Sequence, residues 1–234
     1  MIEHLDRIII AWLRKLTDSS WFVDYSILGI SDNNLLKGAL FLTALWWFWF
    51  KRSTDQRRNR TLVISALAAG LLAVAINQLL MRITPMRGRP YMADLPDVYF
   101  NYDLGIGMRN SFPSDHASLF FALATGLFFL NKRVGIIAWL YTIVVICIPR
   151  AYIGLHYPSD LFGGAVIGTF SACLLHKTRL QEKIARPVLA IAEKYPGPFY
   201  ATVFLFSYQL ATLFDDLRDL GNWLKVVMDN FKDR

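Results

Sequence analysis

The sequence of 234 residues is poor in cysteine and in charge. Two cysteines are too few for a disulfide-rich scaffold or for a zinc site with four cysteine ligands. Charged residues make up only 18% of the chain, whereas hydrophobic residues make up 55%. This balance excludes disordered and collagen-like chains, and it leaves too little charged surface to cover an ordinary soluble domain. A net charge of +7 on so apolar a chain indicates an anionic partner, either nucleic acid or lipid.

Long apolar runs are what the sequence has in excess. A helix needs about 20 apolar residues to cross a hydrocarbon core of roughly 30 Å, and several runs approach this length. The six candidate spans are 36–50, 61–81, 117–131, 134–148, 161–175 and 197–214. They predict an all-α, multi-pass membrane protein in which 1–234 form a single domain, a bundle of six transmembrane helices. The alternative is a soluble protein with a buried helical core, but such cores rarely contain six runs so free of charge.

Lysine and arginine are unevenly distributed among the connections between these runs. The connections 51–60, 131–133 and 176–196 hold 12 Lys and Arg but only three acidic residues. Because short cytoplasmic loops carry an excess of positive charge, the dense cluster in 51–60 places this side in the cytoplasm and both termini outside. The excess charge therefore indicates topology in a plasma (inner) membrane. Nucleic acid is not an expected partner, since its binding would give no reason for six apolar spans.

Both ends of the chain have amphipathic patterns. Residues in about 1–30 form an interfacial segment, with an apolar stripe at helical spacing: Ile2, Leu5, Ile8, Ile9, Trp12, Leu13 and Leu16. Charged residues interrupt this stretch, which does not fit a signal peptide. A second stripe lies in about 215–234: Leu217, Leu220, Trp223, Leu224, Val227, Met228 and Phe231. Each stripe predicts either a helix in the membrane interface or a helix that packs against the protein's own bundle.

The two outer connections between spans contain residues suited to phosphate chemistry. They are, in chain order, Arg82, Arg89, Ser114, Asp115, His116, Arg150, His156 and Asp160. A guanidinium can bind two phosphate oxygens at once, and the helix predicted to start after Ser114 would present free N–H groups to an anion. A carboxylate one helical turn from a histidine can hold one ring nitrogen and leave the other for nucleophilic attack. We expect Arg87 and Arg109, in contrast, to extend toward lipid headgroups.

Three segments together resemble the tripartite signature of the type-2 phosphatidic acid phosphatase superfamily. They are Arg82-(six residues)-Arg89-Pro90, Pro113-Ser114-Asp115-His116 and Arg150-(five residues)-His156-(three residues)-Asp160. The six-helix layout also fits this superfamily across nearly the whole chain. Arg82 stands where the family usually has lysine, Pro149 where it has serine and Asp115 where it has glycine. The Asp115 variant is similar to undecaprenyl-diphosphate phosphatases of the bacitracin-resistance type, which favours a diphosphate lipid.

The resemblance implies phosphoryl transfer in two steps, without a metal or another cofactor. His156 would attack the phosphorus while Asp160 orients its ring, and His116 would protonate the leaving oxygen and later deprotonate water. The phosphate oxygens would be bound by Arg82, Arg89, Arg150, Ser114 and backbone N–H groups near Asp115. We expect the Asp115 carboxylate to point away from the phosphate, toward an arginine or His116, and to raise the pKa of that histidine.

The predicted function is dephosphorylation of a membrane lipid at the outer face of a bacterial plasma membrane, with undecaprenyl diphosphate as the leading substrate. Phosphatidylglycerophosphate, phosphatidic acid or another lipid phosphate are alternative substrates, and a second lipid could accept the phosphate instead of water. A different class is a non-catalytic binder or transporter of lipid phosphates. Such a protein would have little use for His116, His156 and Asp160 together. The expected partners are the lipid substrate and membrane lipids, and no pattern indicates the oligomeric state.

Overall fold

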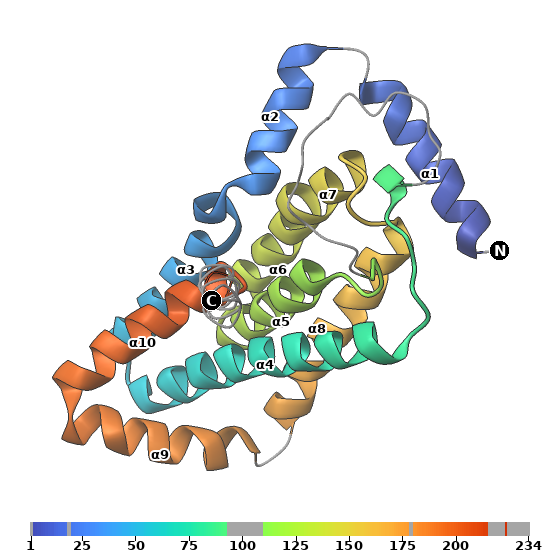
Figure 1. Cartoon of the computed structure of the whole chain (residues 1–234). Helices are drawn as coiled ribbons and strands as arrows, with labels where there is room; N and C mark the ends of the chain where they lie inside the picture. Colours follow the sequence, from blue (N-terminus) through green and yellow to red (C-terminus); the bar gives the residue numbers. More distant parts are fainter. Residues whose placement is uncertain (1, 18–19, 93–109, 178–179, 215–222, 224–234) are drawn as a thin grey trace, which may run out of the picture.

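A computed structural model describes residues 2–17, 20–92, 110–177, 180–214 and 223 of the chain (Figure 1). The helices are α1 (Ile2–Thr17), α2 (Trp21–Asp32), α3 (Leu40–Phe50), α4 (Gln56–Ile83), α5 (Asp115–Leu130), α6 (Lys132–Tyr141), α7 (Ile148–Tyr152), α8 (Pro158–Lys177), α9 (Leu180–Lys194) and α10 (Pro196–Ala211). Two π-helical segments, η1 (Leu35–Ala39) and η3 (Thr142–Cys147), lead into α3 and α7, and η2 (Pro90–Met92) is a 3-10 turn. These ranges contain no β-strand, so the predicted all-α class is confirmed.

The predicted membrane spans all fall on helices, but the count of six is not confirmed. Three helical stretches are long and apolar enough to cross a membrane: α4, the continuous stretch Lys132–Tyr152 and α8. Leu35–Phe50 and Asp115–Leu130 are apolar but shorter. Asp115–Leu130 ends early because Asn131 begins a new helix, its Oδ1 accepting hydrogen bonds from the N–H groups of Arg133 and Val134 at 3.0 and 3.1 Å. The structure thus supports a membrane protein with at least three candidate spans among its described residues.

Helix α5 is the centre of the bundle and packs against α4, α6 and α8 (Figure 1). Residues 117–127 of α5 are buried without interruption, as expected for a helix that is apolar on all sides. The main core cluster around it is contributed largely by α3, α4 and α5, and includes Phe41, Leu45, Val63, Leu119, Phe120 and Leu123. An interior helix of this kind holds its first turn in a fixed position relative to three neighbours.

The approach of α5 to α8 is closest where α8 has glycine. A Cβ atom built on Gly168 would lie 2.2 Å from the carbonyl oxygen of Ser118, and one on Gly164 would lie 2.5 Å from that of Ser114. No larger residue fits, because the two backbones are already in contact. The spacing Gly164-x-x-x-Gly168 therefore fixes the second and third turns of α8 against the first two turns of α5.

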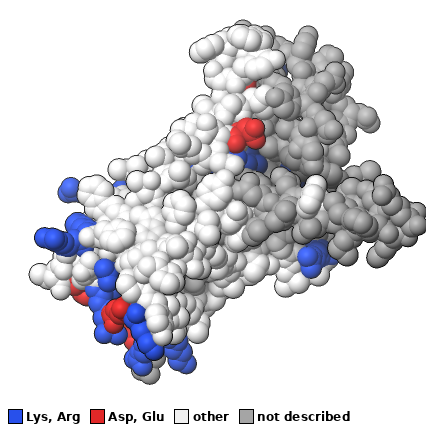
Figure 2. All heavy atoms as spheres, turned by 60° about the vertical axis from the view of Figure 1, so that its left-hand side comes forward, with Lys and Arg blue, Asp and Glu red and all other residues white. Residues whose placement is uncertain are grey.

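The two ends of the bundle differ in charge. Lysine and arginine side chains gather toward one end of the molecule (Figure 2). The exposed basic residues of 51–60, of 131–133 and of helix α9 are Lys51, Arg52, Arg57, Arg58, Lys132, Arg133, Lys183, Arg186 and Lys194. Because α4 runs antiparallel to both α5 and α8, the C-terminal end of α4 and the N-terminal ends of α5 and α8 meet at the other end. That other end carries the predicted site residues.

Helix α1 has two different faces. Asp6, Ile10 and Leu13 are buried and form the face that packs against α7 and α8. The remaining apolar side chains of the predicted stripe are exposed: Ile2, Leu5, Ile8, Ile9, Trp12 and Leu16. The helix therefore packs against its own bundle and still presents an apolar face outward. The predicted amphipathic segment 215–234 lies outside the described residues except for Trp223, which is exposed.

Candidate active site

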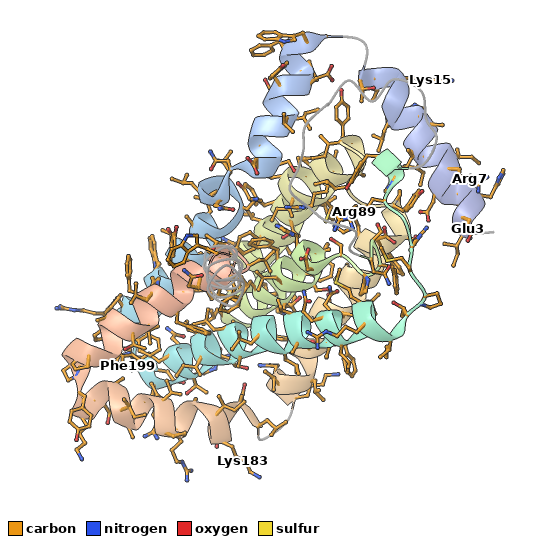
Figure 3. The ribbon with its side chains drawn as sticks, viewed as in Figure 1. Glu3, Arg7, Lys15, Arg89, Lys183 and Phe199 are labelled. Atoms are coloured by element: carbon orange, nitrogen blue, oxygen red, sulfur yellow. The ribbon has the colours of Figure 1, made fainter. Side chains whose placement is uncertain are left out.

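Three connections converge at the end of the bundle opposite the basic cluster. They are the segment that follows α4, the segment that precedes α5 and the short connection between α7 and α8. Arg89 (labelled in Figure 3) joins the first to the third, because its Nη1 donates to the carbonyl oxygen of Leu155 at 3.3 Å. Two backbone hydrogen bonds complete the convergence: Ser114 N–H donates to the Asp160 carbonyl and Tyr91 N–H to the Gly154 carbonyl, both at 3.1 Å. The three sequence motifs thus form one site.

The turn between α7 and α8 fixes the position of His156. Gly154 has a φ of +74°, a conformation that is strained for residues with a side chain. Beyond it, the chain folds back so that the N–H groups of Leu155 and His156 both donate to the carbonyl oxygen of Arg150, at 2.9 and 3.3 Å. The His156 side chain is consequently buried, with 1% of the residue exposed.

The hydrogen bond that His156 makes defines which ring nitrogen is free. Its Nδ1 lies 2.9 Å from the carbonyl oxygen of Ser111. A carbonyl can only accept, so Nδ1 carries the proton and Nε2 of the neutral ring carries a lone pair. Burial, followed by the charge of Arg89, lowers the pKa of His156 to about 3. The residue is therefore neutral near pH 7, which is the form that can act as a nucleophile.

Asp160 is fully buried at the first turn of α8 and accepts hydrogen bonds on both oxygens. Its Oδ2 accepts from Ser111 Oγ at 2.6 Å and from Tyr157 N–H at 2.8 Å, and its Oδ1 pairs with Arg87. The distance from Oδ2 to His156 Nδ1 is 3.9 Å, too long for a hydrogen bond. The structure thus differs from the expected direct support of the ring by Asp160. Ser111 lies between them, binding Asp160 through its hydroxyl and His156 through its carbonyl.

The start of α5 presents the second histidine. Ser114 is the N-cap of this helix and is fully buried, its Oγ accepting from Ala117 N–H at 3.5 Å. Asp115 Oδ1 lies 2.8 Å from both the backbone nitrogen and the Nδ1 of His116. The carboxylate therefore turns back onto His116 and accepts from its Nδ1, which leaves Nε2 of that ring for proton transfer. The expected effect of Asp115 on the pKa of His116 stays a prediction.

The three arginines expected to bind phosphate have different environments. Arg89 and Arg150 are each only 6% exposed, and the charges of both lower the pKa of His156. Their charges therefore lie close to the ring that would attack phosphorus. Arg82 is exposed on the last turn of α4, where no hydrogen bond or ion pair joins it to another described residue. The structure thus places Arg89 and Arg150 with the histidines and leaves Arg82 at the rim.

The expectation that Arg87 extends toward lipid headgroups is wrong. Its guanidinium forms ion pairs with Asp160 and with Asp6 of α1, at 2.5 and 2.6 Å, and it stacks on the Tyr157 ring at 4.3 Å. The two carboxylates hold the half-buried guanidinium at the site, although the sequence alone offered no partner for it. Arg109, for which the same expectation was made, lies outside the described residues.

Two asparagines also support the site. Asn77, a fully buried residue of α4, donates to the Pro113 carbonyl at 3.2 Å and accepts from Ser118 Oγ at 2.9 Å. Asn110 accepts from the N–H groups of Arg87 and Phe112, at 3.1 and 3.2 Å. The signal for Asn77 was a pair of amides, Asn77 and Gln78, in a run without charged residues. Within the described part of the chain, no three His, Cys, Asp or Glu side chains gather as metal ligands would.

Known proteins share both the sequence and the fold of this chain. Residues 58–183 match the model of the PAP2 superfamily. The chain is 33% identical over 147 residues to the bacitracin transport permease protein BcrC of Bacillus licheniformis, covering 63% of this chain and 68% of that one. It is 26% identical over 157 residues to the undecaprenyl-diphosphatase BcrC of Bacillus subtilis, covering 66% and 74%. The crystal structure of Aquifex aeolicus LpxE superposes with a TM-score of 0.50 at 23% identity, covering 72% of this chain and 94% of that one. On the match to more than half of its length, the chain belongs to the PAP2 superfamily.

Proposed function

We propose that this protein is a lipid phosphatase that converts undecaprenyl diphosphate to undecaprenyl phosphate through a phosphohistidine. The observation that carries this proposal is the state of His156. The ring is buried and neutral, and its Nδ1 proton is bound to the Ser111 carbonyl at 2.9 Å. Two buried guanidiniums, Arg89 and Arg150, supply positive charge beside it. This combination of a nucleophile and cations is what attack on a phosphate group needs.

In the first step, Nε2 of His156 attacks the terminal phosphorus. A P–N bond forms while the bond from phosphorus to the bridging oxygen breaks. His116 gives a proton to that oxygen, which leaves as undecaprenyl phosphate. Arg89 and Arg150 stabilise the charge on the phosphoryl oxygens during transfer, assisted by Ser114 and the N–H groups at the start of α5.

In the second step, water attacks the phosphohistidine. His116, now neutral, takes a proton from the water as the P–N bond breaks, and inorganic phosphate leaves. His156 becomes neutral again, with its Nδ1 proton still bound to the Ser111 carbonyl. Asp160 acts through Ser111 and, as positive charge develops on the imidazole, through its negative charge at 3.9 Å from Nδ1.

The diphosphate substrate is favoured by the relatives. One is named an undecaprenyl-diphosphatase and another a bacitracin transport permease protein. Other lipid phosphates would present the same terminal phosphoryl group to the same residues, so phosphatidylglycerophosphate and phosphatidic acid remain alternatives. A lipid acceptor in place of water would make the protein a phosphotransferase. A non-catalytic binder is disfavoured, because binding alone gives no reason to keep the attacking nitrogen of His156 free of its proton.

The charge distribution supports an active site at the outer face of the plasma membrane. The exposed Lys and Arg side chains of 51–60, 131–133 and α9 lie at the end opposite the histidines, and by the positive-inside tendency that end belongs in the cytoplasm. The histidines, at the other end of the bundle, would then meet a headgroup in the outer leaflet. Six spans and both termini outside complete this proposal.

Phosphate release by purified protein tests the function. Wild-type protein in detergent, with a chelator present, is given undecaprenyl diphosphate, phosphatidylglycerophosphate and phosphatidic acid. His156→Ala is expected to abolish release from all of them. His176→Ala is the matched control, because His176 lies at the other end of α8 and stacks on Phe129. Sustained release by His156→Ala would overturn the mechanism, and a strong preference for a glycerophospholipid would overturn the substrate.

A further inference from the structure

One carboxylate of helix α1 is buried at the edge of the active site. Asp6 is 2% exposed, although its neighbours Glu3 and Arg7 are exposed. Burying a charged group is costly unless hydrogen bonds and an opposite charge replace its water. A buried charge on an otherwise amphipathic helix therefore calls for an explanation beyond packing.

Among the described residues, the hydrogen-bond partners of Asp6 are Ser159, which precedes Asp160, and Arg87. Its Oδ1 accepts from Ser159 N–H at 2.9 Å, and its Oδ2 accepts from Ser159 Oγ and from Arg87 Nη2, both at 2.6 Å. The other terminal nitrogen of Arg87, Nη1, donates to Ser159 Oγ at 2.8 Å and pairs with Asp160 Oδ1. Arg87 thus bridges two carboxylates, one from α1 and one from α8.

The bridge continues to the nucleophile. With Oδ1 held by Arg87, the other oxygen of Asp160 accepts from Ser111 Oγ at 2.6 Å, and the Ser111 carbonyl accepts from His156 Nδ1 at 2.9 Å. The backbone provides a second connection between the same residues, because Ser111 N–H donates to the Arg87 carbonyl at 2.9 Å. Four side chains and one carbonyl therefore connect α1 to the ring that attacks phosphorus.

Helix α1 is also held by contacts outside this network. Ile10 and Leu13 are buried against the bundle, and the hydroxyl of Tyr152 donates to the Leu16 carbonyl at 3.2 Å. Helix α2 is attached to the same hydroxyl, whose single proton is shared between the Leu16 carbonyl and Asp24 Oδ1. The ion pair between Asp6 and Arg87 instead fixes the orientation of Arg87 and Asp160.

We propose that Asp6 and Arg87 are positioning residues for the proposed phosphoryl transfer. Asp6 orients Arg87, which keeps Asp160 on Ser111 and thereby keeps Nδ1 of His156 on the Ser111 carbonyl. The N-terminal helix is on this view part of the active site, although it lies outside the residues that match the family model. The proposal rests on the proposed function for its kinetic test only.

Kinetics with matched variants separate positioning from attachment. Asp6→Asn and Arg87→Gln are each expected to lower kcat by about 10- to 100-fold, the cost of misplacing a catalytic group by around an ångström, with little change in KM. The double variant should lose no more than the worse single variant, because both act through one path. Glu3→Gln, which removes the same charge from the same helix, and Asp24→Asn, which loosens α2, should keep kcat within about twofold of wild type.

Two results would overturn the proposal. One is a kcat for Asp6→Asn that equals the kcat of the wild-type protein. The other is equal loss of kcat and of melting temperature in Asp6→Asn and Asp24→Asn, which would make Asp6 an anchor only.

A spectroscopic readout keeps this test independent of the substrate. The chain has four histidines, so ¹⁵N-histidine NMR in detergent resolves them, and His156→Ala identifies the signal of His156. Wild type and Glu3→Gln should show the Nδ1–H tautomer at this ring, whereas Asp6→Asn should show exchange between tautomers. An unchanged His156 signal in Asp6→Asn refutes positioning even if no lipid tested is a substrate. Failure of wild type to release phosphate, in contrast, refutes only the proposed function.

Discussion

Substituting alanine for Gly168 should damage the active site from a distance. The added Cβ would lie 2.2 Å from the Ser118 carbonyl oxygen and 2.8 Å from Ala122 N, both backbone atoms of α5 that cannot rotate away. Normal van der Waals contact requires about 3.5 Å, so α8 must move from α5 by about 1 Å. Because α8 carries Asp160 and α5 carries His116, that movement separates the two halves of the site.

Gly168→Ala should lower both the stability of the protein and its kcat. Overpacking of this kind destabilises by about 1–3 kcal/mol, and misplacing catalytic groups by about 1 Å lowers kcat by up to about 100-fold. Phosphate release and the melting temperature in detergent measure the two parts. Gly29→Ala is the matched control, because a Cβ there meets nothing within 4 Å. Full activity in Gly168→Ala would refute the conclusion that close approach of α5 and α8 aligns the site.

Three further predictions concern the network around the nucleophile. Ser111→Ala removes a hydrogen bond to buried Asp160, worth about 1.5–3 kcal/mol. The kcat of phosphate release should therefore fall about 10- to 100-fold. A drop in kcat of less than threefold would contradict the role given to Ser111. Asn77→Leu leaves the Pro113 carbonyl without its donor and should lower the free energy of unfolding by about 1–3 kcal/mol. An unchanged melting temperature would show that Asn77 does not support the site in this way. Burial and the charge of Arg89 lower the pKa of His156 from 6.5 to about 3, so protonation of this ring opposes folding. Its contribution to the free energy of unfolding should be fully present above about pH 6.5 and should decline as the pH falls toward 3. His156→Gln should flatten that decline in melting temperature, and an identical decline in the variant would show that other groups cause it.

The candidate catalytic residues could be recognised in the sequence because charge is rare in this chain. His116, His156 and Asp160 stand out beside apolar runs, and the helix pattern alone places them at one end of a bundle. The histidines and two of the three arginines come together in the structure as the motifs implied. Arg82 does not, since the last turn of α4 points it outward, an orientation that spacing in the sequence does not determine.

The residues that position the nucleophile were not predictable in the same way. Ser111 acts through its backbone carbonyl as well as its hydroxyl. Every residue has a backbone carbonyl, so the residue type cannot indicate this role. Asp6 lies more than 80 positions before Arg87, and each alone is typical of a solvated surface residue. Their pairing depends on how α1 packs against α7 and α8, which is a tertiary contact. The count of six spans stays a prediction, because Leu35–Phe50 and Asp115–Leu130 are apolar but shorter than the three candidate spans.

The covalent intermediate tests the central claim most directly. Purified protein is mixed with undecaprenyl diphosphate labelled on its terminal phosphate, quenched within milliseconds in base, in which phosphohistidine survives, and digested with trypsin. The label is expected in the peptide 151–177, which contains His156 and His176, and it should be absent in His156→Ala but present in His176→Ala. Label in the peptide 110–132, which contains His116, or release of phosphate without any labelled peptide, would contradict the assignment of His156 as the nucleophile.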